Sequence, residues 1–214
     1  MSNGKFTLGV VGAQNTGKTT FIKDLIEYTK NSRIYLPFTS VGCDYRKKIE
    51  EAGLQINQNG NIRCQNIILD TLIEQLDIIK GMGDGNYVTD RSPIDNFVYS
   101  TWLSEHRPES AITSIDLAEI YKKMKDSIKE YDAIVFLDVD NCRDIEIVDD
   151  HFRDTDPKFR AEVDKIFKDT FVRLGSECLG DKLNCLIKGT REQRVEQFLN
   201  WYDKYIIKSE EAYK

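Results

Sequence analysis

The stretch GAQNTGKTT, residues 12–20, holds the residues whose types and spacing most clearly suggest chemistry. After Gly12 come four residues and then Gly17, Lys18 and Thr19, the pattern of a loop that wraps phosphate groups. Gly12 and Gly17 let backbone N–H groups turn toward phosphates, Lys18 reaches the outer ones, and the Thr19 hydroxyl ligates Mg²⁺. The residues expected to bind the nucleotide are Gly12, Asn15, Thr16, Gly17, Lys18, Thr19 and Thr20.

A second pair of residues could also do chemistry. Asp90 ends the apolar run NYVTD, residues 86–90, and Arg91 follows it directly. The aspartate can hold the metal or take a proton, and the guanidinium can clamp phosphate oxygens. A GTPase would carry an N-K-x-D guanine reader, which VFLDVDNCRD at residues 135–144 lacks. A motor ATPase would place a glutamate beside the strand end to polarise water. We therefore expect ATP and Mg²⁺, with Thr19 and Asp90 as metal ligands, and transfer to a second substrate. A purely structural Asp–Arg pair is the alternative.

Short apolar runs of strand length alternate with helix-length periodic segments, which predicts a parallel sheet covered by helices on both faces. The expected strands are residues 6–12, 33–38, 86–90, 133–139 and 183–188. Helical spacing of apolar residues is clearest at 67–79 and 163–174, and a helix is expected after Gly17. The fold class expected is α/β, a P-loop NTPase fold with a parallel sheet of about five strands.

Composition narrows the function classes. The 214 residues, 40% hydrophobic and 31% charged, fit a single domain spanning 1–214, and the net charge of -6 argues against polyanion binding by the whole surface. The cysteines are five in number and scattered, so reduced thiols are expected rather than disulfides or a zinc site. No signal peptide and no apolar stretch of about 18 residues is seen, so we expect a cytoplasmic protein without membrane contact.

Three segments together resemble one family: GAQNTGKTT, VTDRSPIDNFVYS at 88–100, and DDHFRDTDPKFRAEVDKIF at 149–167. They are similar to P-loop kinases related to the ribosylnicotinamide kinase domain of NadR, phage-type members included. The likeness extends to FTSVGCDYRKKIEEAGLQIN at 38–57, so it covers most of the chain from Phe6 to about Leu174. The resemblance implies a kinase-type fold with a lid.

The resemblance places that lid at about residues 139–160. It implies that Arg153 and Arg160 face the phosphates as the lid closes, with Asp156 shaping the lid. His151 stands where the family pattern has a glycine, so the lid geometry differs from that pattern. From the residues and the resemblance together, the expected catalytic set is Lys18, Asp90, Arg91, Arg153 and Arg160.

The acceptor of the phosphate is expected in the region of residues 38–80 and beside the helix after Pro93. The resemblance suggests a nucleoside or nucleoside monophosphate contacted by Asp44, Arg46, Gln65 and Asp95. Each has a plain alternative: Arg46 fits a solvated amphipathic helix, and Gln65 and Asp95 fit structural roles, Asp95 in the first turn of its helix. Asp90 or Asp44 could serve as the base for a hydroxyl acceptor, and arginines would hold a phosphate.

Three functions remain open. The favoured one is transfer of the terminal phosphate of ATP to a small-molecule nucleoside or nucleotide acceptor. The alternatives are a kinase acting on a modified base or end within DNA, whose affinity would fall steeply with salt, and a non-enzymatic ATP-binding switch or regulator. A small-molecule partner is thus expected before nucleic acid, and assembly into a homodimer stays open.

Overall fold

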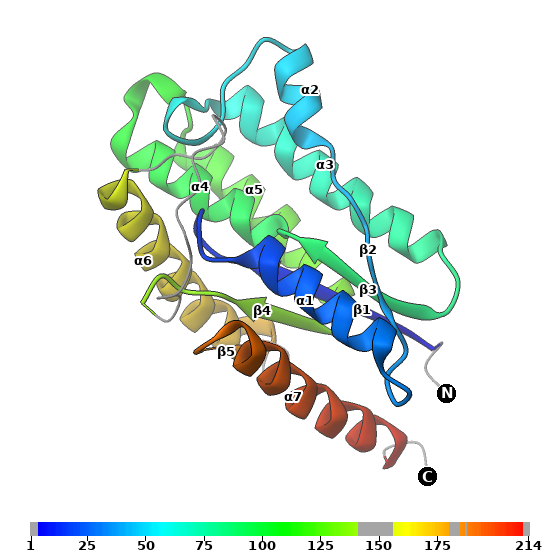
Figure 1. Cartoon of the computed structure of the whole chain (residues 1–214). Helices are drawn as coiled ribbons and strands as arrows, with labels where there is room; N and C mark the ends of the chain where they lie inside the picture. The colour runs from blue at the N-terminus through cyan, green and yellow to red at the C-terminus, as the bar shows by residue number, and fades with distance from the viewer. Residues whose placement is uncertain (1–3, 141–155, 180–184, 187, 212–214) are drawn as a thin grey trace.

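The computed structural model describes residues 4–140, 156–179, 185–186 and 188–211. Five parallel strands form one sheet in the order β2-β3-β1-β4-β5, and helices lie on both of its faces (Figure 1). The strands are β1 (Lys5–Val11), β2 (Phe38–Ser40), β3 (Gly85–Asp90), β4 (Ala133–Phe136) and β5 (Cys185–Leu186). The α-helices are α1 (Lys18–Asn31), α2 (Tyr45–Glu51), α3 (Ile62–Gly81), α4 (Pro93–His106), α5 (Ser114–Ser127), α6 (Pro157–Leu174) and α7 (Arg191–Glu211).

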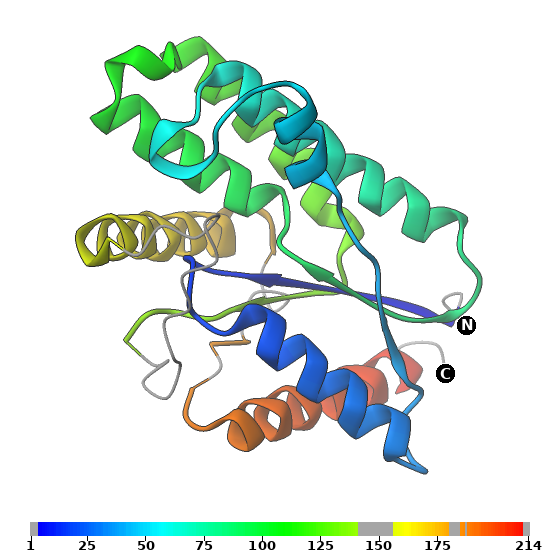
Figure 2. The same ribbon diagram turned by 45° about the horizontal axis from the view of Figure 1, so that its top comes forward.

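Each face of the sheet has its own apolar core. On one face α1 and α7 pack together, and on the other α3, α4, α5 and α6 form a helical layer, as the turned view shows (Figure 2). Strand β1 supplies Leu8 and Val10 to the first core and Val11 to the second, all 0% exposed. A central strand that is buried on both faces must be apolar almost throughout, which explains the nearly continuous apolar run in KFTLGVV.

The sequence predictions for β1, β3, β4 and β5 are confirmed in type and place, with ends that shift by one to three residues. The prediction of a strand over 33–38 is wrong, because the strand there, β2, covers Phe38–Ser40. The apolar residues that suggested it are not buried: Ile34 is 87% exposed and Leu36 is 56% exposed. Of that run Phe38 is buried, with its ring edge-on against Phe6, and Tyr35 is partly buried against the same core.

Helix capping residues fix where the functional helices begin. Ser92 caps α4 and forms a capping box with Asp95, and Pro93 occupies the first turn, where its missing N–H costs nothing. Asn61 caps α3 by accepting a hydrogen bond from the Cys64 backbone N–H at 2.9 Å. These caps fix the first residues of α3 and α4, the two helices that face the carboxyl end of β3.

The parallel register brings the loop after β1 beside the end of β3. Val10 pairs with Asp90, and the Arg91 N–H donates to the Val10 carbonyl at 2.9 Å. On the other side of β1, Val11 pairs with Phe136, so the turn after β4 also meets this loop. Within the part of the chain that the structure describes, no helix is long and apolar enough to cross a bilayer.

Candidate active site

The loop between β1 and α1 adopts a conformation that its glycines make accessible. Gly12 has a φ of 145°, and a Cβ added to it would lie 2.3 Å from the Leu137 carbonyl oxygen. Gly17 has a φ of 84° and immediately precedes the first turn of α1. Because of these angles the chain turns sharply, and the amino end of a 14-residue helix faces the loop. Such an end attracts phosphate through its free N–H groups and its dipole.

Lys18 lies buried within this loop rather than extending into solvent. It is 6% exposed, and its Nζ donates to the carbonyl oxygens of Gly12 at 2.8 Å and Ala13 at 2.7 Å. Beside it, the amide of Asn15 is buried, and neither of its polar atoms has a hydrogen-bond partner among the described residues. A buried amide without partners is costly, so this loop is built to receive further polar groups.

The Thr19 hydroxyl donates to a carboxylate oxygen of Asp90 at 2.6 Å, joining the start of α1 to the end of β3. These two oxygens fit Mg²⁺, which proteins usually hold through one or two side-chain oxygens together with substrate phosphates and water. No cluster of three or more metal-binding side chains exists among the described residues. The donor set therefore suits a metal that arrives with a nucleotide.

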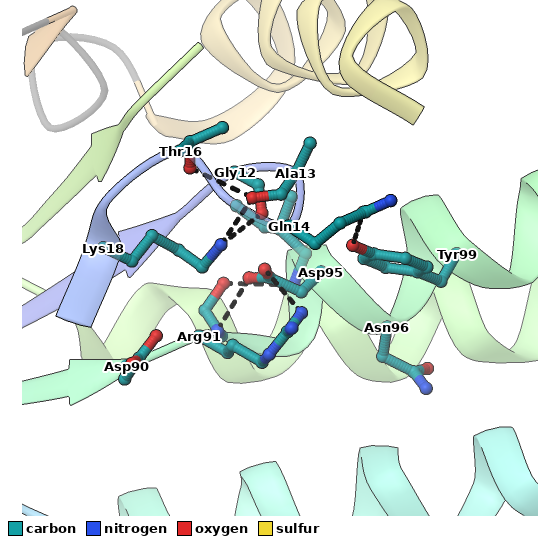
Figure 3. A network of polar contacts seen from close by, with 12 residues as sticks. Gly12, Ala13, Gln14, Thr16, Lys18, Asp90, Arg91, Asp95, Asn96 and Tyr99 are labelled. Atoms are coloured by element: carbon teal, nitrogen blue, oxygen red, sulfur yellow. Dashed lines mark hydrogen bonds and ion pairs between the residues drawn. The ribbon is translucent and has the colours of Figure 1, made fainter. Parts of the chain in front are cut away.

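Arg91 is the residue that connects the loop to the helical layer (Figure 3). Its backbone has a φ of 89°, a left-handed conformation that side-chain-bearing residues rarely adopt. Its guanidinium carbon lies 6.0 Å from the centre of the Tyr45 ring and 5.6 Å from that of Tyr99, and Nη1 lies 3.5 Å from Asp95. The two rings and the carboxylate hold the cation in place, so its charge is positioned before any ligand binds.

Asp95 combines a capping role with this ion pair. Its Oδ2 accepts from the Ser92 N–H at 3.0 Å, as the structural alternative in the sequence suggested, and its side chain is only 2% exposed. Burial raises the pKa of Asp95 to about 6, although the nearby charges of Arg91 and Lys18 oppose that rise. The carboxyl group is therefore sensitive to pH in a range where ordinary aspartates are fully ionised.

This elevated pKa predicts a measurable pH dependence of stability. The folded protein binds the Asp95 proton more tightly than the unfolded chain, so the contribution is present below pH 3.8 and is lost as pH rises through about 6. Asp95→Asn should remove this dependence. The unfolding free energy of the wild type, relative to the variant, is expected to fall by roughly 2 kcal/mol between pH 4 and pH 7, measured by urea denaturation.

Asp116→Asn is the matched control, because Asp116 completes the same kind of capping box on α5. Hydrogen bonds from the Thr113 side chain and backbone lower the pKa of Asp116, so its contribution to stability is lost as pH falls. The control should therefore change the pH profile in the opposite direction. A wild-type curve parallel to that of Asp95→Asn across this range would show that Asp95 titrates normally.

A recess opens between α2, α3 and α4 next to Arg91. The residues that line it are Tyr45, Ile56, Asn57, Gln65, Ile68, Arg91, Asp95, Asn96 and Tyr99. Gln65 and Asn96 form a pair here: the Asn96 Nδ2 donates to both the backbone carbonyl and the Oε1 of Gln65, each at 2.8 Å. Two acceptors identify that atom as the nitrogen, and Asn96 Oδ1 is then a buried acceptor without a partner among the described residues.

The recess includes some of the expected acceptor contacts and leaves out others. Gln65 and Asp95 line it, whereas Asp44 is exposed at the start of α2 and Arg46 is half-buried on that helix, both outside the lining. Arg160 lies in the first turn of α6, where its Nε is buried without a partner among the described residues. Arg153 and most of the expected lid, residues 141–155, lie outside the described residues.

Two further side chains belong to the site although nothing in the sequence marked their roles. Gln14 of the loop accepts a hydrogen bond from the Tyr99 hydroxyl at 2.6 Å (Figure 3). No prediction from the sequence gave the Tyr99 hydroxyl a role. For Gln14 the available signal was a long polar side chain at a variable position of the phosphate loop.

Comparisons with known proteins agree with this geometry. A protein family described as an AAA domain matches residues 9–194. Comparison with curated proteins finds no match. Among solved structures, NadR protein in complex with NAD and AMP-PNP superimposes with a TM-score of 0.62 at 15% identity, over 92% of this chain and 49% of that chain. The chain thus spans about half the length of the NadR chains that it matches.

Two smaller enzymes are matched along nearly their whole length. Thymidylate kinase from Candida albicans has a TM-score of 0.64 at 14% identity, over 100% of this chain and 96% of that chain. Deoxyadenosine kinase from M. mycoides with bound dATP has a TM-score of 0.57 at 11% identity, over 92% and 99%. At such identities the likeness establishes the fold, a P-loop NTPase fold of the kinase type.

Proposed function

We propose that this chain, which belongs to the AAA domain family, is a phosphotransferase that moves the terminal phosphate of ATP to a small nucleoside or nucleoside monophosphate. The observation that carries this proposal is the position of Arg91. It leaves β3 directly beside the phosphate loop, and its guanidinium lines the neighbouring recess. One preplaced cation therefore lies between a nucleotide-type loop and a second, small recess of about 30 Å³, which would widen to admit an acceptor for direct transfer between two bound substrates.

On the nucleotide side, the loop residues bind and orient the donor. Lys18 neutralises the outer phosphates, and Thr19 with Asp90 fixes the position of Mg²⁺. When bound, Mg²⁺ supplies charge that stabilises the leaving phosphate oxygens. Arg160, whose Nε lacks a partner among the described residues, is proposed to meet the phosphates from α6.

On the acceptor side, the recess offers groups suited to a nucleoside. Tyr45 and Tyr99 present aromatic surface, and the Gln65–Asn96 pair presents amide groups that can hydrogen-bond the edge of a base. A nucleoside hydroxyl would lose its proton to a carboxylate such as Asp90, whereas a monophosphate would be held by Arg91. Both acceptor types fit the proposed function.

The test is an acceptor screen with ATP labelled in its terminal phosphate. Nucleosides and nucleoside monophosphates are supplied one at a time, and the label is followed by thin-layer chromatography. We expect transfer to at least one of them, with much slower release of free phosphate when no acceptor is present. DNA ends and single-stranded DNA are included at two salt concentrations, since binding to a polyanion weakens steeply with salt.

Two outcomes of the screen would overturn the proposed function. Transfer confined to DNA, and lost at high salt, would assign the site to nucleic acid. Tight ATP binding by equilibrium dialysis without transfer to any acceptor would favour an ATP-dependent switch, because the loop would then bind the nucleotide without a chemical step.

A further inference from the structure

The side chain of Gln14 lies between the two halves of the proposed site. It belongs to the phosphate loop, yet it turns away from Lys18 and toward Tyr99 on α4 (Figure 3). The Tyr99 hydroxyl donates to Gln14 Oε1 at 2.6 Å, and both residues are buried, Gln14 at 3% exposure and Tyr99 at 6%. This short contact joins residues 85 positions apart and bridges the loop and the acceptor recess.

The same hydrogen bond fixes which way the Gln14 amide points. The Tyr99 hydroxyl also hydrogen-bonds the Arg91 guanidinium, which can only donate. The proton of the hydroxyl is therefore left for Gln14 Oε1, and the nitrogen lies at the other end of the amide. Gln14 Nε2 is buried and has no hydrogen-bond partner among the described residues. Burial raises the pKa of Tyr99 to about 12, so its hydroxyl remains a donor at neutral pH and keeps the amide in this orientation.

A buried N–H₂ group without an acceptor costs free energy, on the order of 1–3 kcal/mol, unless a ligand satisfies it. The group most able to do so is the negatively charged phosphoryl group, which must pass between the loop and the recess. Tyr99 also faces Arg91, with the guanidinium carbon 5.6 Å from its ring centre, so one side chain orients both a neutral and a cationic donor.

We propose that Gln14 is a catalytic residue that donates a hydrogen bond from Nε2 to the transferring phosphoryl group, and that Tyr99 is the positioning residue which orients it. This rests on the proposed function. In the transfer, a bond forms between the acceptor oxygen and the γ-phosphorus as the bond from that phosphorus to the bridging oxygen of ADP breaks. A hydroxyl acceptor gives its proton to Asp90. Gln14 keeps both of its protons and is unchanged by the reaction.

A double-mutant cycle tests whether Tyr99 acts through Gln14. Gln14→Met keeps the length of the side chain but removes the donor, and kcat should fall by about 10²-fold. Tyr99→Phe keeps the ring against Arg91 and removes the hydroxyl, which contacts both Gln14 Oε1 and the Arg91 guanidinium. Its kcat should fall by about tenfold with the KM for ATP changed less than about threefold. Adding Tyr99→Phe to Gln14→Met should cause a much smaller loss than in the wild-type background, because the amide to be oriented is then absent and only the contact with Arg91 is removed.

Tyr131→Phe is the matched control, because Tyr131 is another fully buried tyrosine. Its hydroxyl accepts a hydrogen bond from the Thr89 hydroxyl, with 3.3 Å between the two oxygens, instead of contacting the phosphate loop. Its kcat should equal that of the wild type. If Tyr99→Phe lowers kcat equally in the wild-type and the Gln14→Met backgrounds, Tyr99 does not act through Gln14. Wild-type turnover of Gln14→Met would remove Gln14 from the reaction.

A second measurement does not require the acceptor to be known. The side-chain ¹⁵N–¹H₂ resonances of Gln14, assigned by their loss in Gln14→Met, should shift when ADP, Mg²⁺ and aluminium fluoride are added, since this complex mimics a phosphoryl group in transfer. The shift should shrink in Tyr99→Phe. Unmoved resonances in a protein that binds the complex would overturn the proposal. Failure of every acceptor with a clear shift would instead overturn only the proposed function.

Discussion

Lys18→Ala is expected to lower kcat by at least about 10³-fold while the protein remains folded. Lys18 supplies the cation that follows the outer phosphates into the transition state, and an alanine methyl group cannot replace that charge. The buried Nζ also holds the Gly12 and Ala13 carbonyl oxygens, so the free loop should become more mobile without loss of the sheet. Single-turnover transfer from labelled ATP measures the effect, and circular dichroism checks the fold.

Lys23→Ala is the matched control for this prediction. Lys23 lies on the same helix, is exposed, and carries the same charge, so the variant changes the net charge of the protein equally. Its rate should stay within about twofold of the wild type, because exposed charges interact weakly across a Debye length. Equal losses in both variants would mean that Lys18 acts through the overall charge. Normal turnover by Lys18→Ala would remove the loop from the reaction.

Arg91→Ala is expected to lower kcat/KM for the acceptor by roughly 10²- to 10³-fold. The guanidinium is preplaced between two rings and a buried carboxylate, so its charge acts on the phosphate without reorganisation. Arg91→Lys should recover only part of this loss, since an ammonium keeps the charge but not the planar fork. Steady-state kinetics at saturating ATP, with the acceptor varied, separate the three proteins.

Arg173→Ala provides the matched control for Arg91. Arg173 also lies over a tyrosine ring, 4.1 Å from the centre of Tyr121, and also pairs with a carboxylate, Glu177 at 2.8 Å, but it is on the far end of α6. Its side chain is 55% exposed, against 16% for Arg91, so its replacement removes a stacked and paired arginine from the surface and should leave kcat/KM unchanged. An Arg91→Ala variant that matches this control would make Arg91 a structural residue, as the alternative Asp–Arg pair suggested.

The local pattern of residue types predicted most strands and helices correctly, but it predicted their burial less well. The phosphate loop could be predicted because its glycines perform a local backbone task, and Gly12 and Gly17 indeed adopt φ values of 145° and 84°. The central strands could be predicted because burial on both faces demands an unbroken apolar run. The run at 33–38 is also mostly apolar, but Ile34 is 87% exposed, because apolar composition alone does not determine what will pack against a residue.

The residues of the candidate site also differ in whether local sequence could predict them. The roles proposed for Lys18 and Thr19 rest on spacing within one loop and one helical turn, so the sequence alone is enough to predict them. The acceptor side depends on pairs that are remote in the chain: Asn96 bonds Gln65 across 31 positions, and Tyr99 bonds Gln14 across 85. No local period relates such positions, and Asp44 and Arg46, which were also predicted as acceptor contacts, lie outside the recess.

The sequence by itself therefore determined the nucleotide loop, the α/β order and the Asp90–Arg91 pair, because each depends on backbone geometry over a few consecutive residues. The tertiary structure alone decided which side chains face Arg91 and which way the amide of Gln14 points. The physical reason is that hydrogen bonds and ring contacts of this kind require atoms to approach within about 3–6 Å. That approach is set by the packing of α4 against α3, α5 and α6, not by distance along the chain.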